Sequence, residues 1–179
     1  MREVKLTKAA ERQLSKYCVS FYEKDIETSV KSFVPGEWVT VSTQSLNYIG
    51  FINPNVNAGP VLRVIKEFDG TKGIESIISN LLKDAWKRRV RFERYENYRL
   101  CYGEADLLPG LIIDVFENYI LIQINTAGVD THRVFIKKEI ENIFKDKEVV
   151  LFDNENYRKN EVLPTFENVN VGNVEINES

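Results

Sequence analysis

The chain has 179 residues, a formal net charge of −3, 43% hydrophobic residues and 28% charged residues. This composition is typical of a soluble globular protein with a real core, and no apolar run approaches the roughly 20 residues that a membrane span needs. The amino terminus lacks the pattern of a secretory signal, so we expect a cytoplasmic protein that does not act at a membrane.

Residues 1–70 carry short apolar runs separated by turn signals such as Pro35-Gly36. We predict a strand at 4–6, a helix that Thr7 caps and that ends at Tyr17, and strands at 19–22, 26–30, 37–43, 48–53 and 61–68. The helix should turn Ala9, Leu14 and Tyr17 inward. Strands this short and this regular favour a small barrel or an open sheet, and we treat 1–70 as one domain.

At Gly70-Thr71-Lys72-Gly73 the apolar period changes from two to 3.6, which we take as the domain boundary. A long amphipathic helix is predicted from Ile74 to about Tyr95. Its polar side stacks four basic residues at steps of four and three: Lys83, Lys87, Arg91 and Arg94. This row could face phosphates, and a simple solvated face is about as well supported.

The second domain, 71–153, is predicted to be mixed α and β. We expect a strand at 98–102, a loop at 103–110, a hairpin of 111–116 and 119–126, a helix capped by Asp130 or Thr131 that ends near Lys145, and a strand at 148–152. The helix should turn five residues inward: Val134, Phe135, Ile140, Ile143 and Phe144. Residues 154–179 are predicted to be a link that is either frayed or ordered by a partner.

The charge is unevenly distributed along the chain. From Asp153 onward there are six acidic and two basic residues, so in a chain of net charge −3 the residues before Asp153 sum to +1. Any basic surface must therefore come from local clustering.

Several kinds of site are excluded by residue type. The nine glycines form neither GxGxxG nor GxxxxGK(S/T), and Cys18, Cys101 and the single His132 cannot alone make a zinc site. His132 near Asp130 and Cys101 in mid-strand are read as structural rather than catalytic. Glu104, Asp106 and Asp114 could form a metal or acid-base site, but the glycines and proline around them favour tight backbone geometry.

Residues 98–128, including Tyr-Gly-Glu-Ala-Asp-Leu-Leu-Pro-Gly-Leu-Ile-Ile-Asp, resemble the S-adenosylmethionine-dependent ribosomal RNA cytosine-5 methyltransferases. In that family a PUA domain is followed by a mixed α/β middle domain and a Rossmann-like methyltransferase domain. Gly36-Glu37-Trp38-Val39, Gly50 to Asn55 and Arg63-Val64-Ile65 are similar to the PUA strands. The resemblance implies an α+β chain, with a small PUA-like β-barrel before the middle domain.

In the family the segment similar to 154–164 leads into the methyltransferase domain, whereas this sequence ends at Ser179. We therefore expect no catalytic residue, metal or cofactor in this chain. In the full-length family, S-adenosylmethionine is the cofactor of the methyltransferase domain. The chain would be either a shortened piece or a natural short protein, inactive without a methyltransferase domain in cis or in trans.

The resemblance implies binding of RNA, namely the ribosomal RNA that the family modifies, through seven residues: Asn53, Asn55, Arg63, Lys83, Lys87, Arg91 and Arg94. It also implies a structural motif of six residues: Gly103, Glu104, Asp106, Pro109, Gly110 and Asp114. Two alternatives stay open. One is a protein-interaction module that docks a separately encoded methyltransferase domain, and the other is a small-molecule enzyme that uses the three carboxylates.

Overall fold

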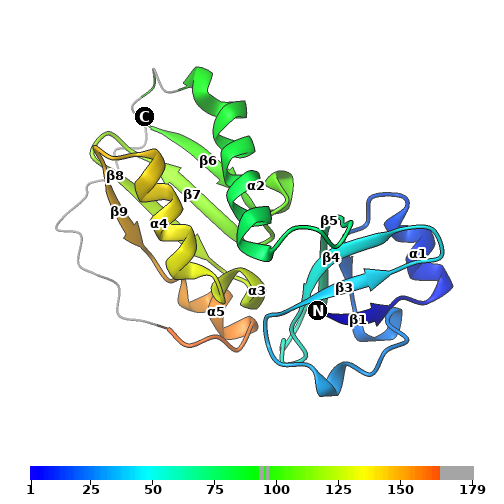
Figure 1. Ribbon diagram of the computed structural model, residues 1–179. Coiled ribbons are helices and arrows are strands. Elements are labelled where there is room, and N and C mark those ends of the chain that lie inside the picture. The colour runs from blue at the N-terminus through cyan, green and yellow to red at the C-terminus, as the bar shows by residue number, and fades with distance from the viewer. Residues whose placement is uncertain (93–94, 96, 166–179) are drawn as a thin grey trace.

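The computed structural model describes residues 1–92, 95 and 97–165. The first part of the chain contains β1 (Arg2–Lys5), α1 (Lys8–Leu14), β2 (Ser20–Phe21), β3 (Glu37–Ser42), β4 (Asn47–Ile52) and β5 (Leu62–Glu67). The second contains α2 (Ile74–Arg89), β6 (Tyr98–Tyr102), β7 (Leu111–Val115), β8 (Tyr119–Ile124), α3 (Ala127–Asp130), α4 (Arg133–Ile143), β9 (Glu148–Leu151) and α5 (Glu155–Asn160). The chain is therefore α+β, with two sheets side by side (Figure 1).

The first sheet has the strand order β1-β3-β4-β5-β2, in which β1 runs parallel to β3 and the other neighbours are antiparallel. It is not the closed barrel that the resemblance implies. Closure needs a continuous ladder between the edge strands, and β2 has only two residues. The segments that follow β1 and β2 are joined in the described residues by one isolated bridge, between Leu6 and Ile26.

Two details of the first part differ from the prediction. Thr7 does cap α1, since its hydroxyl accepts from the amide of Ala10, but the helix buries Ala10 and Leu14 rather than Ala9. Tyr17 lies beyond the helix with φ 69° and is 92% exposed. The predicted strand at 26–30 is wrong, because this segment contains only the Ile26 bridge and then enters a 3-10 turn at Val30–Ser32.

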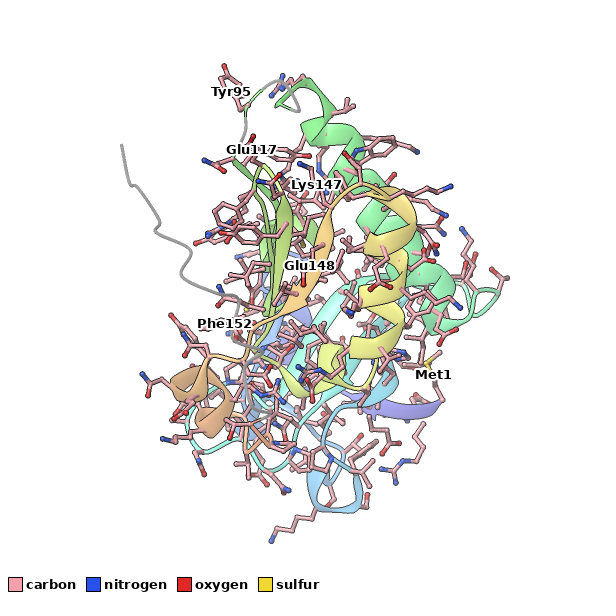
Figure 2. The ribbon with its side chains drawn as sticks, turned by 90° about the vertical axis from the view of Figure 1, so that its left-hand side faces the viewer. Met1, Tyr95, Glu117, Lys147, Glu148 and Phe152 are labelled. Atoms are coloured by element: carbon pink, nitrogen blue, oxygen red, sulfur yellow. The ribbon has the colours of Figure 1, made fainter. Side chains whose placement is uncertain are left out.

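The second sheet has the order β6-β7-β8-β9, and its four strands lie where the sequence predicts them. The β7–β8 hairpin is antiparallel, whereas β9 runs parallel to β8 because α3 and α4 cross over between them. Figure 2 shows α2 and α4 together on one side of this sheet, and Ser79 of α2 donates a hydrogen bond to Glu139 of α4. At one end of the sheet, Lys147 donates to the carbonyls of Phe116 and Glu117.

The predicted start of α4 is wrong. Asp130 and Thr131 do not cap it, because a separate short helix, α3, ends at Asp130, and His132 precedes α4 without a side-chain cap. Val134 is 78% exposed, and Ile136 takes the inward position instead. Ile140 and Phe144 are buried as predicted, and Phe135 and Ile143 pack against the core.

The two sheets share a hydrophobic core across the Gly70–Gly73 segment. Trp38, Ile49, Phe51 and Ile65 of the first sheet belong to the same buried cluster as α2 and the second sheet. Gly128 of α3 allows this contact, since a Cβ there would lie 2.0 Å from the Phe51 ring, and its carbonyl accepts from Trp38 Nε1 at 2.9 Å. Division into domains at residue 70 stays a prediction, and the contact makes the two parts one packed body.

Among the helices in the part of the chain that the structure describes, none has the length and apolar composition of a membrane span.

Candidate functional site

Helix α2 carries the row of basic residues that the sequence predicts. Its inward side is apolar, and the buried residues recur every three or four positions: Ile77, Ile78, Leu81, Leu82 and Ala85. On the other side Lys83 and Lys87 are exposed, and Arg91 is exposed in the 3-10 turn that continues the helix. We call these three residues the basic face. Arg94, the fourth residue of the predicted row, lies outside the described residues.

Lys83 and Lys87 of the basic face are at most weakly engaged in salt bridges. Lys87 lies 3.6 Å from Asp84, and both side chains are more than half exposed. Such a pair contributes little, about 0–1 kcal/mol, so it does not prevent Lys87 from meeting a phosphate. The described residues provide no salt bridge for Lys83. These two lysines can therefore offer their charge to an anionic partner.

Asp106 joins the end of α2 to the turn after β6. Its carboxylate, 2% exposed, accepts from Arg88 at 2.7 Å, from both terminal nitrogens of Arg89 at 2.8 Å and from the amide of Tyr102 at 2.7 Å. Burial pushes the pKa of Asp106 upward, but the hydrogen bonds from Arg89 and Arg88 outweigh it and leave the pKa below its usual value. Asp106 is thus an ionised anchor for the turn.

The rest of this turn depends on unusual backbone angles. Gly103, Leu107 and Gly110 have φ of 49°, 60° and 78°, in the left-handed region that favours glycine. Gly110 also packs closely on Thr126, whose Cγ2 would lie 2.3 Å from an added Cβ, and the Thr126 hydroxyl donates to the Pro109 carbonyl at 2.7 Å. The glycines and the proline of the motif therefore have structural tasks.

The three carboxylates of the motif do not form one site. Asp114 pairs with Arg99 across the β6–β7 ladder at 2.7 Å, Asp106 binds Arg88 and Arg89, and Glu104 is exposed. Within residues 1–92, 95 and 97–165, no three His, Cys, Asp or Glu side chains gather as a metal site. The geometry gives no support to acid-base or metal chemistry at these acids.

His132 and Cys101 have environments that account for them without catalysis. His132 packs edge-on against Trp38 with ring centroids 5.6 Å apart, and burial lowers its pKa although Glu75 opposes this. Burial, with the nearby charge of Asp106, raises the pKa of Cys101 to about 12, so its thiol stays protonated near neutral pH. Cys18 is half-buried, and its thiol donates to the Ser20 carbonyl.

Two of the predicted RNA contacts of the first sheet lie inside the molecule. Asn53 is 0% exposed and donates to both the carboxylate and the carbonyl of Glu161 at 2.9 Å. Arg63, whose side chain is 11% exposed, pairs with Glu161 at 2.7 Å. These groups cannot reach an RNA without breaking buried bonds, so the RNA hypothesis is left to exposed residues, of which Asn55 is one.

Glu161 and Arg158, at the end of α5, form what we call the α5 latch. Arg158 is 0% exposed and donates to Asp130 at 2.9 Å, to the Ile124 carbonyl at 2.8 Å and to the Pro164 carbonyl at 2.6 Å. Glu161 also accepts from the Ala127 amide at 3.2 Å. The latch thus joins the first sheet to α3 and β8, and Figure 1 shows α5 beside both parts.

Sequence reasoning missed α5 and its latch. A signal was present: Asn154 is an N-cap that accepts from the amides of Asn156 and Tyr157, with Glu155 in the first turn and two basic residues in the last. A helix of six residues has too few apolar positions for a period to be seen, so only the cap and the charges mark it.

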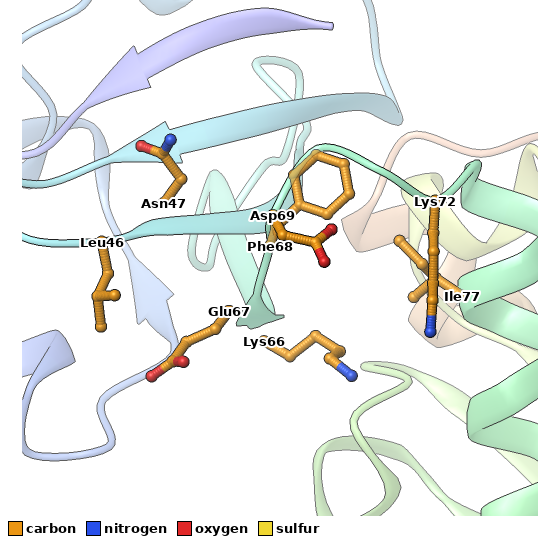
Figure 3. Close-up of a pocket in the computed structure, with 8 residues that line it drawn as sticks. All are labelled: Leu46, Asn47, Lys66, Glu67, Phe68, Asp69, Lys72 and Ile77. Carbon is orange, nitrogen blue, oxygen red and sulfur yellow. The ribbon is translucent and has the colours of Figure 1, made fainter.

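A cavity of about 370 Å³ lies between the two parts, where β4 begins, β5 ends and α2 is about to start. Figure 3 shows the residues that line it: Leu46, Asn47, Lys66, Glu67, Phe68, Asp69, Lys72 and Ile77. Lys66 and Lys72 lie on the α2 side, whereas Leu46 and Glu67 lie on the opposite side. It combines apolar groups with charges of both signs.

The described residues do not fit S-adenosylmethionine, which the family resemblance assigns to a separate methyltransferase domain. Such a cofactor lies beyond the carboxyl ends of parallel strands, against a glycine-rich turn that opens a helix. Parallel pairing occurs here at β1–β3 and β8–β9. The glycine that follows β8, Gly128, packs on Phe51 and leaves no room for a ligand, so no chemical step is derived through the cofactor.

Comparison with known proteins connects these features to methyltransferases. No protein-family model matches the chain. It is 41% identical over 51 residues to the ribosomal RNA large subunit methyltransferase I of Klebsiella pneumoniae subsp. pneumoniae, covering 28% of this chain and 13% of that protein. It is 30% identical over 83 residues to the protein of the same name from Shigella boydii serotype 18, covering 44% and 21%. The matches therefore span about a fifth or less of these relatives.

Two solved chains share the fold over most of this chain. One, described as "a putative sam-dependent methyltransferase from Streptococcus mutans", superposes with a TM-score of 0.70 at 16% identity and covers 86% of this chain and 41% of its own. Another, "a putative methyltransferase complexed with SAH", gives 0.71 at 16% identity, with 88% and 41% covered. The chain is thus similar in sequence to part of an rRNA methyltransferase, and its two-sheet fold occurs as part of methyltransferase chains.

Proposed function

We propose that this chain is the RNA-binding and substrate-positioning portion of an rRNA methyltransferase. The observation that carries the proposal is the 30% identity over 83 residues to ribosomal RNA large subunit methyltransferase I. The proposal places the RNA on α2, because Lys83 and Lys87 of its basic face are exposed. Lysines and arginines in a row supply sequence-independent affinity for phosphates.

The proposal treats the fold as a rigid platform. The shared core and the α5 latch hold the basic face at a fixed position relative to the first sheet, where Asn55 is exposed at the turn after β4. RNA is read largely through its shape and backbone, so a platform of fixed geometry can orient it. The PUA-like role of the first sheet is part of this proposal.

The finer chemistry follows from the family resemblance. It implies methyl transfer to C5 of a cytosine, with S-adenosylmethionine held by a separate methyltransferase domain. The two solved chains extend well beyond the part that this chain matches, which is 41% of each. This favours a working arrangement in which the platform acts with a methyltransferase domain, in cis or in trans.

The test measures RNA affinity by fluorescence anisotropy at two salt concentrations, with a labelled single-stranded rRNA fragment. The variant is Lys83→Glu/Lys87→Glu, and the control is Lys16→Glu/Lys31→Glu, which makes the same change of net charge at exposed lysines of the first part. We expect weak binding by the α2 variant, with the slope of log affinity against log salt reduced by roughly one for each lost phosphate contact.

Two results would overturn the proposal. One is RNA affinity that does not change with salt, and the other is equal loss of affinity in the α2 variant and in the control.

A further inference from the structure

The cavity between the two parts has the chemistry of a nucleotide site, an inference that rests on the proposed RNA-binding function. We propose that it receives one unpaired nucleotide of the bound RNA, with the phosphate toward α2 and the base toward Glu67. Its volume, about 370 Å³, lies within the range of small-molecule sites, about 300–1,000 Å³.

The apolar part of the cavity suits the flat face of a base. Phe68 is half-buried and packs on the shared core, Ile77 is buried, and Leu46 is 44% exposed at the rim. Leu46 lies across the cavity from Phe68 and Ile77 (Figure 3), and a base seated between them would remove apolar surface from solvent. Unpaired bases commonly bind by packing on such side chains.

The two lysines of the cavity suit the phosphate. Lys66 and Lys72 are exposed, and the described part of the chain gives neither a salt bridge. Asp69 does not compete strongly for Lys72, because its carboxylate accepts from both the amide and the hydroxyl of Thr71. Hydrogen bonds from Thr71 lower the pKa of Asp69, with a smaller contribution from Lys72. Lys72 thus keeps its charge available for an anion.

The cavity lies at the start of α2, and the basic face lies toward its end. Exposed side chains line the way from the segment before α2, along the helix and into the 3-10 turn after it: Lys72, Ser76, Asn80, Lys83, Lys87 and Arg91. The 16-residue helix is about 24 Å long, so a strand that runs along it from Arg91 reaches the cavity at Lys72. A strand on this path would meet basic groups at its two ends, Lys72 at one and Lys83, Lys87 and Arg91 at the other, with polar side chains between them.

Glu67 gives the site a preference among bases. Its carboxylate is exposed at the side of the cavity away from α2 (Figure 3) and can accept from an exocyclic amino group. Cytosine, adenine and guanine carry such a group, whereas uracil presents a carbonyl that a carboxylate repels. The site should discriminate against uridine.

The deciding experiment titrates the whole chain with cytidine 5′-monophosphate and with uridine 5′-monophosphate by calorimetry. We expect the cytidine nucleotide to bind about tenfold more tightly, since one good base contact contributes about 1–3 kcal/mol of discrimination. Glu67→Gln should abolish this preference, because an amide pairs with either base. Lys66→Ala/Lys72→Ala should weaken both nucleotides, and Lys16→Ala/Lys31→Ala should weaken neither.

A second measurement separates this inference from the function on which it rests. Labelled decamers of uridine, with or without one central cytidine, are titrated with the parent chain, with Glu67→Gln and with Lys83→Glu/Lys87→Glu. Equal affinity for both mononucleotides, or a preference that survives Glu67→Gln, overturns the cavity assignment even if the decamers bind. Decamer binding that ignores salt and the α2 variant overturns the proposed function even if cytidine 5′-monophosphate enters the cavity.

Discussion

The α5 latch and the basic face of α2 use the same kinds of side chain in opposite ways. Arg158 is 0% exposed and its guanidinium binds a carboxylate and two carbonyls, while Lys83 and Lys87 lie in solvent with at most an exposed partner. A buried cation must find all its partners within the fold, whereas an exposed one keeps its charge for a ligand. Burial, and not residue type, separates the structural charges of this protein from those available for binding.

The largest effect should come from removing the buried cation of the latch. Arg158→Met keeps much of the side-chain volume but leaves the nearby carboxylates of Asp130 and Asp153 without this partner. Because breaking a buried pair from one side is costly, we expect a loss of about 3–5 kcal/mol in the free energy of unfolding, measured in urea.

The matched control is Lys159→Met in the same helix, where the side chain is 70% exposed and only 3.6 Å from an equally exposed Glu155. It should change stability by no more than about 0.5 kcal/mol. Similar losses in the two variants would contradict the distinction between latch and surface.

A smaller loss of stability is expected at the apolar contact between α3 and the first sheet. Gly128→Ala places a Cβ against the Phe51 ring, so the two sheets must shift apart or the ring must move. Overpacking of this kind typically costs about 1–3 kcal/mol. Thermal unfolding is measured for three variants: Gly128→Ala, the double variant Gly128→Ala/Phe51→Leu, and the control Gly73→Ala. In the control, the added Cβ meets nothing within 4 Å. The double variant should recover part of the loss, and a loss at Gly73 as large as at Gly128 would contradict this.

His132 should add a modest pH dependence at this interface. Its pKa is lowered in the folded protein, mainly by burial, so below about pH 6.5 the unfolded chain takes up the proton first and stability falls as the pH approaches the folded pKa. Urea unfolding between pH 7.5 and pH 5.5 should therefore show a steeper decline in the parent than in His132→Gln. Parallel declines would mean that other groups cause it.

The smallest effect on stability belongs to the basic face. Lys83→Glu/Lys87→Glu should alter the free energy of unfolding by no more than about 0.5 kcal/mol for each residue, because neither side chain is packed. The same variant is expected to lose most of its RNA affinity. A large loss of stability would show that Lys83 and Lys87 stabilise the fold, and it would argue against a binding role for the basic face.

The sequence predicted those elements whose pattern is long and local. α2 and the strands β6, β7, β8 and β9 lie where their periods place them, because many apolar residues in register specify one buried side. The errors at α4 and at 26–30 arise where only a few residues determine the local structure. Helix α3 is four residues long, and the carboxylate of its Asp130 binds Arg133 and Arg158 instead of capping a helix.

The candidate site was harder to predict because exposure depends on distant partners. Asn53 and Arg63 belong to a motif that the resemblance connects with RNA, yet both are occupied by Glu161, about a hundred residues further along. No local pattern can report such a pairing. Lys83 and Lys87 could be placed correctly on the outside, since the helical period alone turns them away from the core.

The pairing of Asn53 with Glu161 spans 108 positions, which has a consequence for how the protein is made. At about 5–20 residues per second, a ribosome adds Glu161 roughly 5 to 20 seconds after Asn53. During that time the first sheet holds a cation, Arg63, and an amide at a surface that the finished protein buries. These contacts therefore form only after the whole of the second sheet has been synthesised, so the burial of Arg63 and Asn53 is a late step in the making of the protein.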